Sequence, residues 1–212
     1  MITSEHIQES IDNALLGISN LEQDRLAVRG FSTPTIRHLF NNLCNIDGKY
    51  LEIGLFCGAT FCSSFNHNCT AIGIEDHSQD FSEGFDKVKQ ELKENVEKFS
   101  GIPYDVKVHY ADCYNMDKSL LPDGFDIYFY DGWHSEEMQA KALPEFLDKM
   151  ADKFIWVVDD YHWDYVASGT TMGIEQLKDK IQIEKKWLLS GQQVLNDSVW
   201  HNGLIILLIN KK

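Results

Sequence analysis

The sequence predicts an α/β fold whose sheet is mainly parallel and is covered by helices on both faces. From residue 49 onward, short apolar segments alternate with helical patterns, which is typical of parallel strands joined by crossover helices. The 212 residues are 43% hydrophobic and 25% charged, as expected of a globular domain with a sizeable core. No repeat, low-complexity tract or Pro/Gly/Ser linker marks a boundary, so we expect a single domain over 1–212.

Helices are expected before the first strand, where they form an N-terminal helical cap over 1–45. Apolar residues recur at helical spacing between 3 and 28, which predicts one or two helices. Thr33 is a candidate N-cap because Pro34 follows it at the first helical position. The helix that begins there is expected to run to about Leu43.

The remaining elements alternate along the chain. The expected strands occupy 49–56, 69–76, 105–112, 125–132, 153–160, about 183–190 and 203–210. The expected helices begin after Gly58, at about 82 (ending at 99), at Ser135 (ending near Lys149) and near Ile174 (ending at Lys180). The last two strands have no room for a crossover helix between them, so they should pair antiparallel.

Charge and cysteine content narrow the class of protein. The formal net charge is -14 and no Lys/Arg cluster interrupts it, which argues against a nucleic-acid partner. Five cysteines are scattered singly, which favours reduced thiols in a cytoplasmic chain. The first residues are too polar for a signal peptide, and the apolar run at 204–209 is too short to span a membrane.

The segment YLEIGLFCGAT, residues 50–60, places two glycines in the turn after the first strand. Gly54 and Gly58 would let the backbone approach a ligand closely, although a simple tight turn is the alternative. Glu52 is ionisable within an otherwise apolar strand. Its carboxylate could accept a hydrogen bond from a cationic amino group, or order the glycine loop through water. The spacing is not GxGxxG, so the dinucleotide-binding fingerprint is missing.

Acidic residues also end the next two strands. Glu75 follows the glycine turn by about twenty residues and could accept both hydroxyls of a ribose, rather than being an ordinary loop residue. Asp112 ends the third strand and is a candidate acceptor for an adenine amino group. These positions fit the rule that ligands of such sheets bind outside the carboxyl ends of the strands.

Three further aspartates fall at strand ends. Asp131 ends the strand at 125–132, and Asp159 and Asp160 end the strand at 153–160. If these strands are neighbours, their ends lie about 5 Å apart and the carboxylates repel one another. A divalent cation such as Mg²⁺ would relieve that repulsion, whereas solvated surface acids are the alternative. His134 follows Asp131 closely and is either a site residue or a partly buried loop histidine.

Together, these motifs resemble those of class I S-adenosylmethionine-dependent methyltransferases. LEIGLFCGAT, FYDGWHS and VVDDY more narrowly resemble the Mg²⁺-dependent O-methyltransferases, of the family 24 type, that modify sugar hydroxyls of macrolide and aminocoumarin antibiotics. Catechol-type O-methyltransferases are more distantly similar. The resemblance covers roughly 28–165. It implies a Rossmann-like, doubly wound sheet of seven strands in the order 3-2-1-4-5-7-6, with strand 7 antiparallel.

The resemblance also implies roles for individual residues. It implies that Glu52, Gly54 and Gly58 line the methionine side of the cofactor, that Glu75 binds the ribose, and that Asp112 and Cys113 flank the adenine. It also implies that Asp131, Asp159 and Asp160 bind the Mg²⁺ and that His134 is the general base. The acceptor would be a small-molecule hydroxyl, deprotonated by His134 and methylated by S-adenosylmethionine. A loop over 161–175 would cover it. Trp133 and Trp163 are bulky departures that would reshape the acceptor pocket.

Other functions remain compatible with parts of the pattern. An NAD-dependent oxidoreductase would use Glu75 equally well, and a binding module could retain the cofactor fold without turnover. A metal-dependent hydrolase could use the same carboxylates. The sequence does not identify the acceptor, the metal or the role of His162, and it is compatible with a homo-oligomer.

Overall fold

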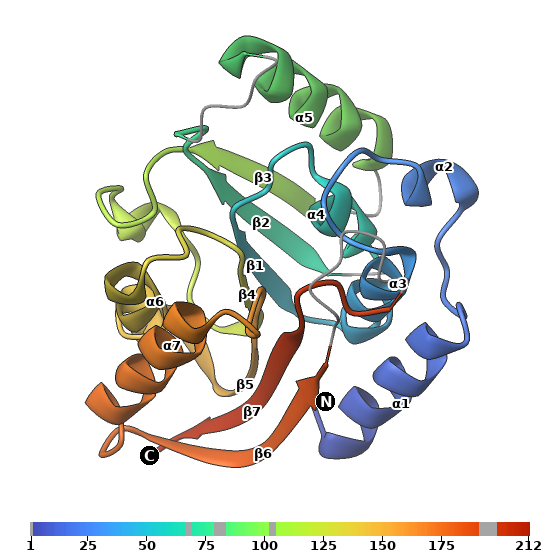
Figure 1. Cartoon of the computed structure of the whole chain (residues 1–212). Coiled ribbons are helices and arrows are strands. Elements are labelled where there is room, and N and C mark those ends of the chain that lie inside the picture. Colours follow the sequence, from blue (N-terminus) through green and yellow to red (C-terminus); the bar gives the residue numbers. More distant parts are fainter. Residues whose placement is uncertain (1, 67–68, 79–83, 102–104, 191–198) are drawn as a thin grey trace.

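The computed structural model describes residues 2–66, 69–78, 84–101, 105–190 and 199–212. Its centre is a seven-stranded sheet in the order β3-β2-β1-β4-β5-β7-β6 (Figure 1). The strands are β1 (Lys49–Ile53), β2 (Thr70–Glu75), β3 (Asp105–Tyr110), β4 (Phe125–Tyr130), β5 (Met150–Val158), β6 (Ile181–Leu189) and β7 (Leu204–Lys211). Strand β7 is antiparallel to both β5 and β6, and the other pairings are parallel. The expected fold class, strand order and antiparallel pairing are therefore confirmed.

Helices cover both faces of this sheet. They are α1 (Ser4–Leu15), α2 (Gln23–Leu26), α3 (Pro34–Leu43), α4 (Ala59–Ser63), α5 (Phe85–Phe99), α6 (Glu136–Ala142) and α7 (Asp164–Gln176). Helices α1, α3, α4 and α5 contribute to one hydrophobic core, whereas α6 and α7 contribute to a second core on the opposite face (Figure 1). Within the described ranges, no helix has the length and apolar character needed to cross a bilayer.

Successive side chains of each central strand point into opposite cores. In β4, Ile127 and Phe129 face the core beneath α3, whereas Tyr128 and Tyr130 face the core beneath α6. This follows from the two-residue period of a strand, and it explains why the central strands are apolar on both faces. The start of α5 expected at 82 lies outside the described residues.

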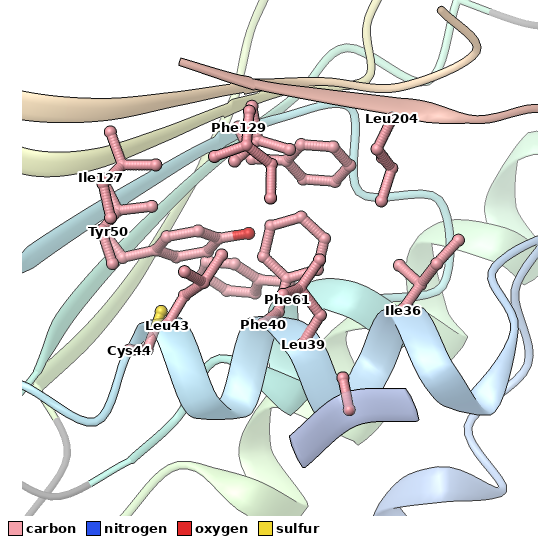
Figure 2. Packing of buried hydrophobic residues seen from close by; sticks show 14 of the residues in the cluster. Ile36, Leu39, Phe40, Leu43, Cys44, Tyr50, Phe61, Ile127, Phe129 and Leu204 are labelled. Carbon is pink, nitrogen blue, oxygen red and sulfur yellow. The ribbon is translucent and has the colours of Figure 1, made fainter. Parts of the chain in front are cut away.

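Helix α3 forms as its sequence predicts. The Thr33 hydroxyl accepts a hydrogen bond from the Ile36 backbone N–H at 3.2 Å, and Pro34 occupies the first turn. Its buried face packs against the sheet, and the rings of Phe40 and Phe129 lie 4.3 Å apart between centroids (Figure 2). This packing holds the loop before α3 close to the carboxyl ends of the strands.

Helix α6 is shorter than expected. It ends at Ala142 rather than near Lys149, and a separate 3₁₀ turn follows over Leu147–Lys149. Pro144 explains the early end, because it lacks a backbone N–H and its ring would collide with the carbonyl one turn before it.

Helix α7 overturns two expectations. It begins at Asp164 and ends at Gln176, so most of 161–175 is helical rather than a loop. The helix expected at 174–180 was therefore placed about ten residues too late in the sequence. Two glycines and several β-branched residues hide it, because they have low intrinsic helix propensity. Packing explains the glycines: a Cβ at Gly169 would lie 2.4 Å from the Glu136 carbonyl oxygen, and one at Gly173 would lie 3.0 Å from that of Ala140. Close approach to α6 therefore stabilises α7.

Candidate functional site

A cavity of about 570 Å³ opens at the carboxyl ends of the central strands. Its lining combines the loops after β1 and β2, which we call the β1–β2 half, with those after β4 and β5, which we call the β4–β5 half. Six of the ten residues expected to bind the cofactor or metal or to act as base line it: Gly54, Glu75, Asp131, His134, Asp159 and Asp160. Four others do not: Glu52, Gly58, Asp112 and Cys113.

The glycine loop fits tightly against β4. Gly54 has φ 84°, and a Cβ at this position would lie 2.1 Å from the carbonyl oxygen of Asp131. The Asp131 N–H donates to the Ile53 carbonyl at 2.9 Å, which fixes the same approach. Gly58 has φ 86° and precedes α4, where its role is to turn the chain.

Glu75 holds the glycine loop in place. Its Oε2 accepts hydrogen bonds from the backbone N–H groups of Leu55 and Phe56, both at 2.7 Å, and its Oε1 accepts one from His77 at 2.7 Å. A carboxylate has about four acceptor positions, so one remains for a ligand. Glu75 is 9% exposed and lines the cavity, so it can meet a hydroxyl there while ordering the loop.

Glu52 lies beneath the cavity rather than in its wall. The residue is fully buried, and the hydroxyls of Tyr50 and Thr60 donate to its two carboxylate oxygens. Burial raises the pKa of Glu52 to about 8, and the hydrogen bonds from Thr60 and Tyr50 oppose this only in part. Thr60 lines the cavity, so its hydroxyl connects the buried Glu52 to the cavity wall.

The pair at the end of β3 stays outside the cavity. The exposed carboxylate of Asp112 accepts hydrogen bonds from the Tyr114 N–H at 2.8 Å and from the Asn115 side chain at 2.5 Å. Cys113 is buried, and burial raises the pKa of its thiol to about 12. Asp76 and Ser78, which follow Glu75, line the cavity instead.

The β4–β5 half gathers the three aspartates. Strands β4 and β5 are parallel neighbours, with Tyr130 opposite Val158, so their ends meet as expected. His134 Nε2 lies 2.9 Å from Asp160 Oδ2 and 3.6 Å from Asp131 Oδ1. These three residues each offer a ligand atom, and the atoms lie within 4.8 Å of one another. Asp159 is outside this trio, and its Oδ1 accepts the Asp160 N–H at 2.9 Å.

The protonation of this cluster follows from burial and crowding. Burial raises the pKa of Asp131 to about 6, and the neighbouring Asp160 carboxylate adds to the shift. Burial also raises the pKa of Asp159 well above its ordinary value, together with repulsion from Asp131 and Asp160. For His134, burial acts in the opposite direction, but Asp131 and Asp160 raise its pKa to about 10. In this structure His134 is the cation that compensates the carboxylates.

The loop between β6 and β7 completes the β4–β5 half, and nothing near the motifs signalled it. The Asn202 side-chain amide donates to Asp160 Oδ1 at 2.6 Å. The N–H groups of Tyr161 and His162 donate to the carbonyls of Gly203 and Asn202, at 3.0 and 3.1 Å. These contacts hold Asp160 at φ 53°, a conformation that is uncommon for aspartate.

The same loop accounts for His162, whose role the sequence left open. A Cβ at Gly203 would lie 2.0 Å from the His162 ring, so this glycine makes room for the histidine. His162 therefore packs the β6–β7 loop against the turn that carries Asp159 and Asp160.

Aromatic rings surround the opening. Phe31, Trp133 and Trp163 line the cavity, and the first two are 65% and 48% exposed. The ring of Trp163 meets His134 edge-on, with centroids 5.0 Å apart. Of these, Phe31 comes from the loop before α3, which the sequence did not connect with the site.

Similarity to known proteins agrees with this geometry. Residues 51–161, just over half of the chain, match the family described as a methyltransferase domain. No curated protein matches the sequence.

Solved structures extend the likeness to the whole fold. The chain is similar to the O-methyltransferase from Bacillus cereus in complex with S-adenosylhomocysteine (SAH), with 14% identity, a TM-score of 0.60, and 99% of this chain and 93% of that chain covered. The SAH-bound methyltransferase of Podospora anserina is 14% identical with a TM-score of 0.57, and the match covers 99% of this chain and 89% of that chain. The fibrillarin/Nop5p complex is 14% identical with a TM-score of 0.52, and the match covers 78% of this chain and 73% of that chain. With its strand order, its strand-end acidic residues and the match over 51–161, the chain belongs to the methyltransferase domain family and is an S-adenosylmethionine-dependent methyltransferase.

Proposed function

We propose that this methyltransferase is a divalent-metal-assisted O-methyltransferase whose acceptor is a hydroxyl of a small molecule, such as a sugar. The observation that carries the proposal is the trio of Asp131, His134 and Asp160 in the same cavity as Gly54 and Glu75. A hydroxyl acceptor needs a base and a means of lowering its pKa, and the β4–β5 half offers residues for both. The similar structure from Bacillus cereus is named an O-methyltransferase, which supports an oxygen atom as the acceptor.

In the β1–β2 half, the residues suit the cofactor. Glu75 keeps one acceptor position for a ribose hydroxyl, and Gly54 lines the cavity without a side chain. Thr60, backed by Glu52, presents a hydroxyl to the methionine end. Asp76 and Ser78 are better placed than Asp112 and Cys113 to meet the adenine, because they line the cavity.

In the β4–β5 half, the donor set fits a hard cation. Asp131, Asp159 and Asp160 offer carboxylate oxygens in a crowded, partly buried place, which is the ligand type that Mg²⁺ prefers. A bound cation would lower the pKa of an acceptor hydroxyl and fix its orientation. The Nε2 of His134 lies next to Asp131 and Asp160, so it adjoins the residues that would hold the cation.

His134 takes the hydroxyl proton at Nε2 only when it is neutral. Its pKa is raised by Asp131 and Asp160, so it stays charged while their negative charge is uncompensated. A cation held by these carboxylates would offset the negative charge that raises the pKa of His134, and a neutral His134 would then be able to accept the proton. Asp131 and Asp160 would thus serve as the residues that hold the cation and that set the base strength of His134.

The test combines metal removal with a base variant. Methyl transfer from S-adenosylmethionine to hydroxyl acceptors should require added Mg²⁺ and be abolished by EDTA. His134→Ala should lower kcat by roughly 10²-fold or more, the typical contribution of a general base. Calorimetry should show SAH affinity close to wild type. His109→Ala is the matched control, since His109 is partly buried in β3 and does not line the cavity.

Two results would contradict the proposal. Full activity in EDTA would remove the metal from it. Loss of SAH binding in His134→Ala would make His134 a structural residue rather than the base.

A further inference from the structure

The charge of the cavity restricts what the acceptor can be. Among the described residues, the lining contains five carboxylates and no lysine or arginine: Glu75, Asp76, Asp131, Asp159 and Asp160. The segments 67–68, 79–83, 102–104 and 191–198 also contain no lysine or arginine in their sequence, so they add no cation. An acidic acceptor would therefore find no basic side chain to pair with.

Two guanidinium groups lie behind the cavity wall, and both are already engaged. The Arg29 guanidinium lies 4.8 Å from the centroid of the Phe56 ring, and its Nη2 is paired with Glu91 at 2.7 Å. Arg37 is buried and donates to Ser32 Oγ and to the Ser32 carbonyl, both at 3.1 Å, and also to the carbonyls of Leu26 and Val28. Phe56 and Ser32 line the cavity, but neither arginine is part of the lining.

Bound ligands do not reverse the sign of this field. The net charge of S-adenosylmethionine is about +1 and that of the divalent cation is +2, and His134 is neutral when it acts as base. Five acidic side chains line the cavity against these charges, and the rest of the chain carries a further excess of negative charge. The acceptor enters a negative environment.

The opening favours a ring. Trp133 is 48% exposed, and Phe31 is 65% exposed, although both are large apolar side chains. Trp163 lines the same half as Trp133. Indole faces stack on flat rings and on the C–H face of a sugar, and they attract cations in preference to anions.

We propose that the acceptor is a ring compound that is neutral or positively charged, and that acceptors bearing carboxylate, phosphate or sulfate groups, nucleic acids included, are discriminated against. This rests on the proposed O-methyl transfer, because it names the acceptor of that reaction. The carboxylates select against anions, and the aromatic rings supply the stacking surface.

The first experiment compares matched acceptors in two ring series. One contains 4-methylcatechol, dopamine and 3,4-dihydroxybenzoate, and the other methyl glucoside, glucosamine and glucuronate. In each series that is methylated, kcat/KM for the neutral and amino compounds should exceed that for the acid by about thirtyfold, which is the effect of two unit charges roughly 8 Å apart at an effective dielectric constant of about 20. Added salt should shrink the ratio. Equal rates for the acid and the neutral compound would overturn the proposal.

A binding measurement separates this proposal from the proposed function. The same six compounds are titrated by calorimetry against the protein loaded with SAH and Mg²⁺. If none is methylated but the neutral and amino compounds bind better than the acids, O-methyl transfer fails while the charge selection stands. If the acids bind equally well, or if no ring binds, the acceptor class is wrong.

Two variants test the residues behind the selection. His201→Lys places a cation in the lining of the β4–β5 half, and it should raise the affinity or kcat/KM for the acid about tenfold relative to the amine. Leu188→Lys is its control, because Leu188 is 54% exposed in β6 and does not line the cavity.

Trp133→Ala should weaken ring binding severalfold at unchanged SAH affinity, whereas Leu188→Ala should change neither. Unaltered ring binding in Trp133→Ala, or no gain for the acid in a folded His201→Lys protein, would count against the proposal.

Discussion

In the β1–β2 half of the cavity, the carboxylate of Glu75 is already satisfied by three backbone N–H groups, whereas in the β4–β5 half the carboxylates of Asp131, Asp159 and Asp160 crowd one another. The first half is complete without a ligand and offers a position for one. The second half is electrostatically unfavourable until a cation or a protonated His134 compensates it. One half is therefore preorganised for an organic ligand, and the other stores repulsion that an ion can relieve.

The largest expected effect tests the crowded half. Asp159→Asn should lower methyl transfer on the order of 10³-fold, because metal assistance is worth several kcal/mol of barrier. Without metal, the melting temperature should stay the same or rise, since an amide avoids the cost of burying an acid beside Asp131 and Asp160, which raises the pKa of Asp159. Activity assays with Mg²⁺ and calorimetric melts in EDTA check both, and Asp148→Asn, on an exposed residue of the 3₁₀ turn, is the control. A strongly lowered melting temperature would mean that the cluster is not strained.

The satisfied half should respond in the opposite way. Glu75→Gln replaces one acceptor oxygen with an amide that cannot accept the loop N–H groups, so SAH affinity should fall about 100-fold. Stability should also fall, by about 2 kcal/mol. Calorimetry and urea denaturation measure these effects, with the exposed Glu94→Gln as the matched control. Unchanged SAH affinity would refute the role of Glu75 in the cofactor half of the site.

A variant of Asn202 tests whether the β6–β7 loop orients the carboxylate of Asp160 in the β4–β5 half. Asn202→Ala removes the amide that orients Asp160, and Mn²⁺ affinity measured by electron paramagnetic resonance should fall by roughly 10- to 100-fold. SAH affinity should stay within about twofold of wild type, because the β1–β2 half does not use this loop. Asn210→Ala, at the other end of β7, should leave both affinities unchanged. A parallel loss of SAH binding would show general disruption.

The smallest expected effect concerns the link between the two halves. Thr33 caps α3, and its hydroxyl also donates to the Val199 carbonyl at 2.5 Å, which ties the loop before α3 to the β6–β7 loop. Thr33→Val should reduce the free energy of unfolding by about 1 kcal/mol, and Thr33→Ser should retain most of it. Urea denaturation distinguishes them, and equal stability of both variants would show that the hydroxyl contributes little.

The sequence predicted the parts of the site that follow from strand order. Parallel strands bring their carboxyl ends to one edge, and the strand order implied by the family resemblance makes the strands of Asp131 and Asp159 neighbours, so these residues and Glu75 could be placed at one edge. Thr33 and Pro34 predicted α3 because the capping signal is local.

The remaining parts depend on contacts between distant segments. Asn202 and Phe31 reach the cavity from loops that carry no motif. The burial that raises the pKa of Glu52 is a property of the packed sheet and of Thr60 above it. Helix α7 depends on how closely Gly169 approaches α6, which intrinsic propensity does not reveal.

The contact at Gly54 has a consequence for how freely this protein can vary. A methyl group there would meet the Asp131 carbonyl at 2.1 Å, and the positive φ adds a second penalty for any side chain. Neither the backbone of Asp131 nor the end of β1 can retreat without moving both halves of the cavity. Substitution during evolution should therefore leave Gly54 unchanged, whereas Phe31 and Trp133 at the opening can vary. The acceptor could then change while the backbone contact at Gly54 stays the same.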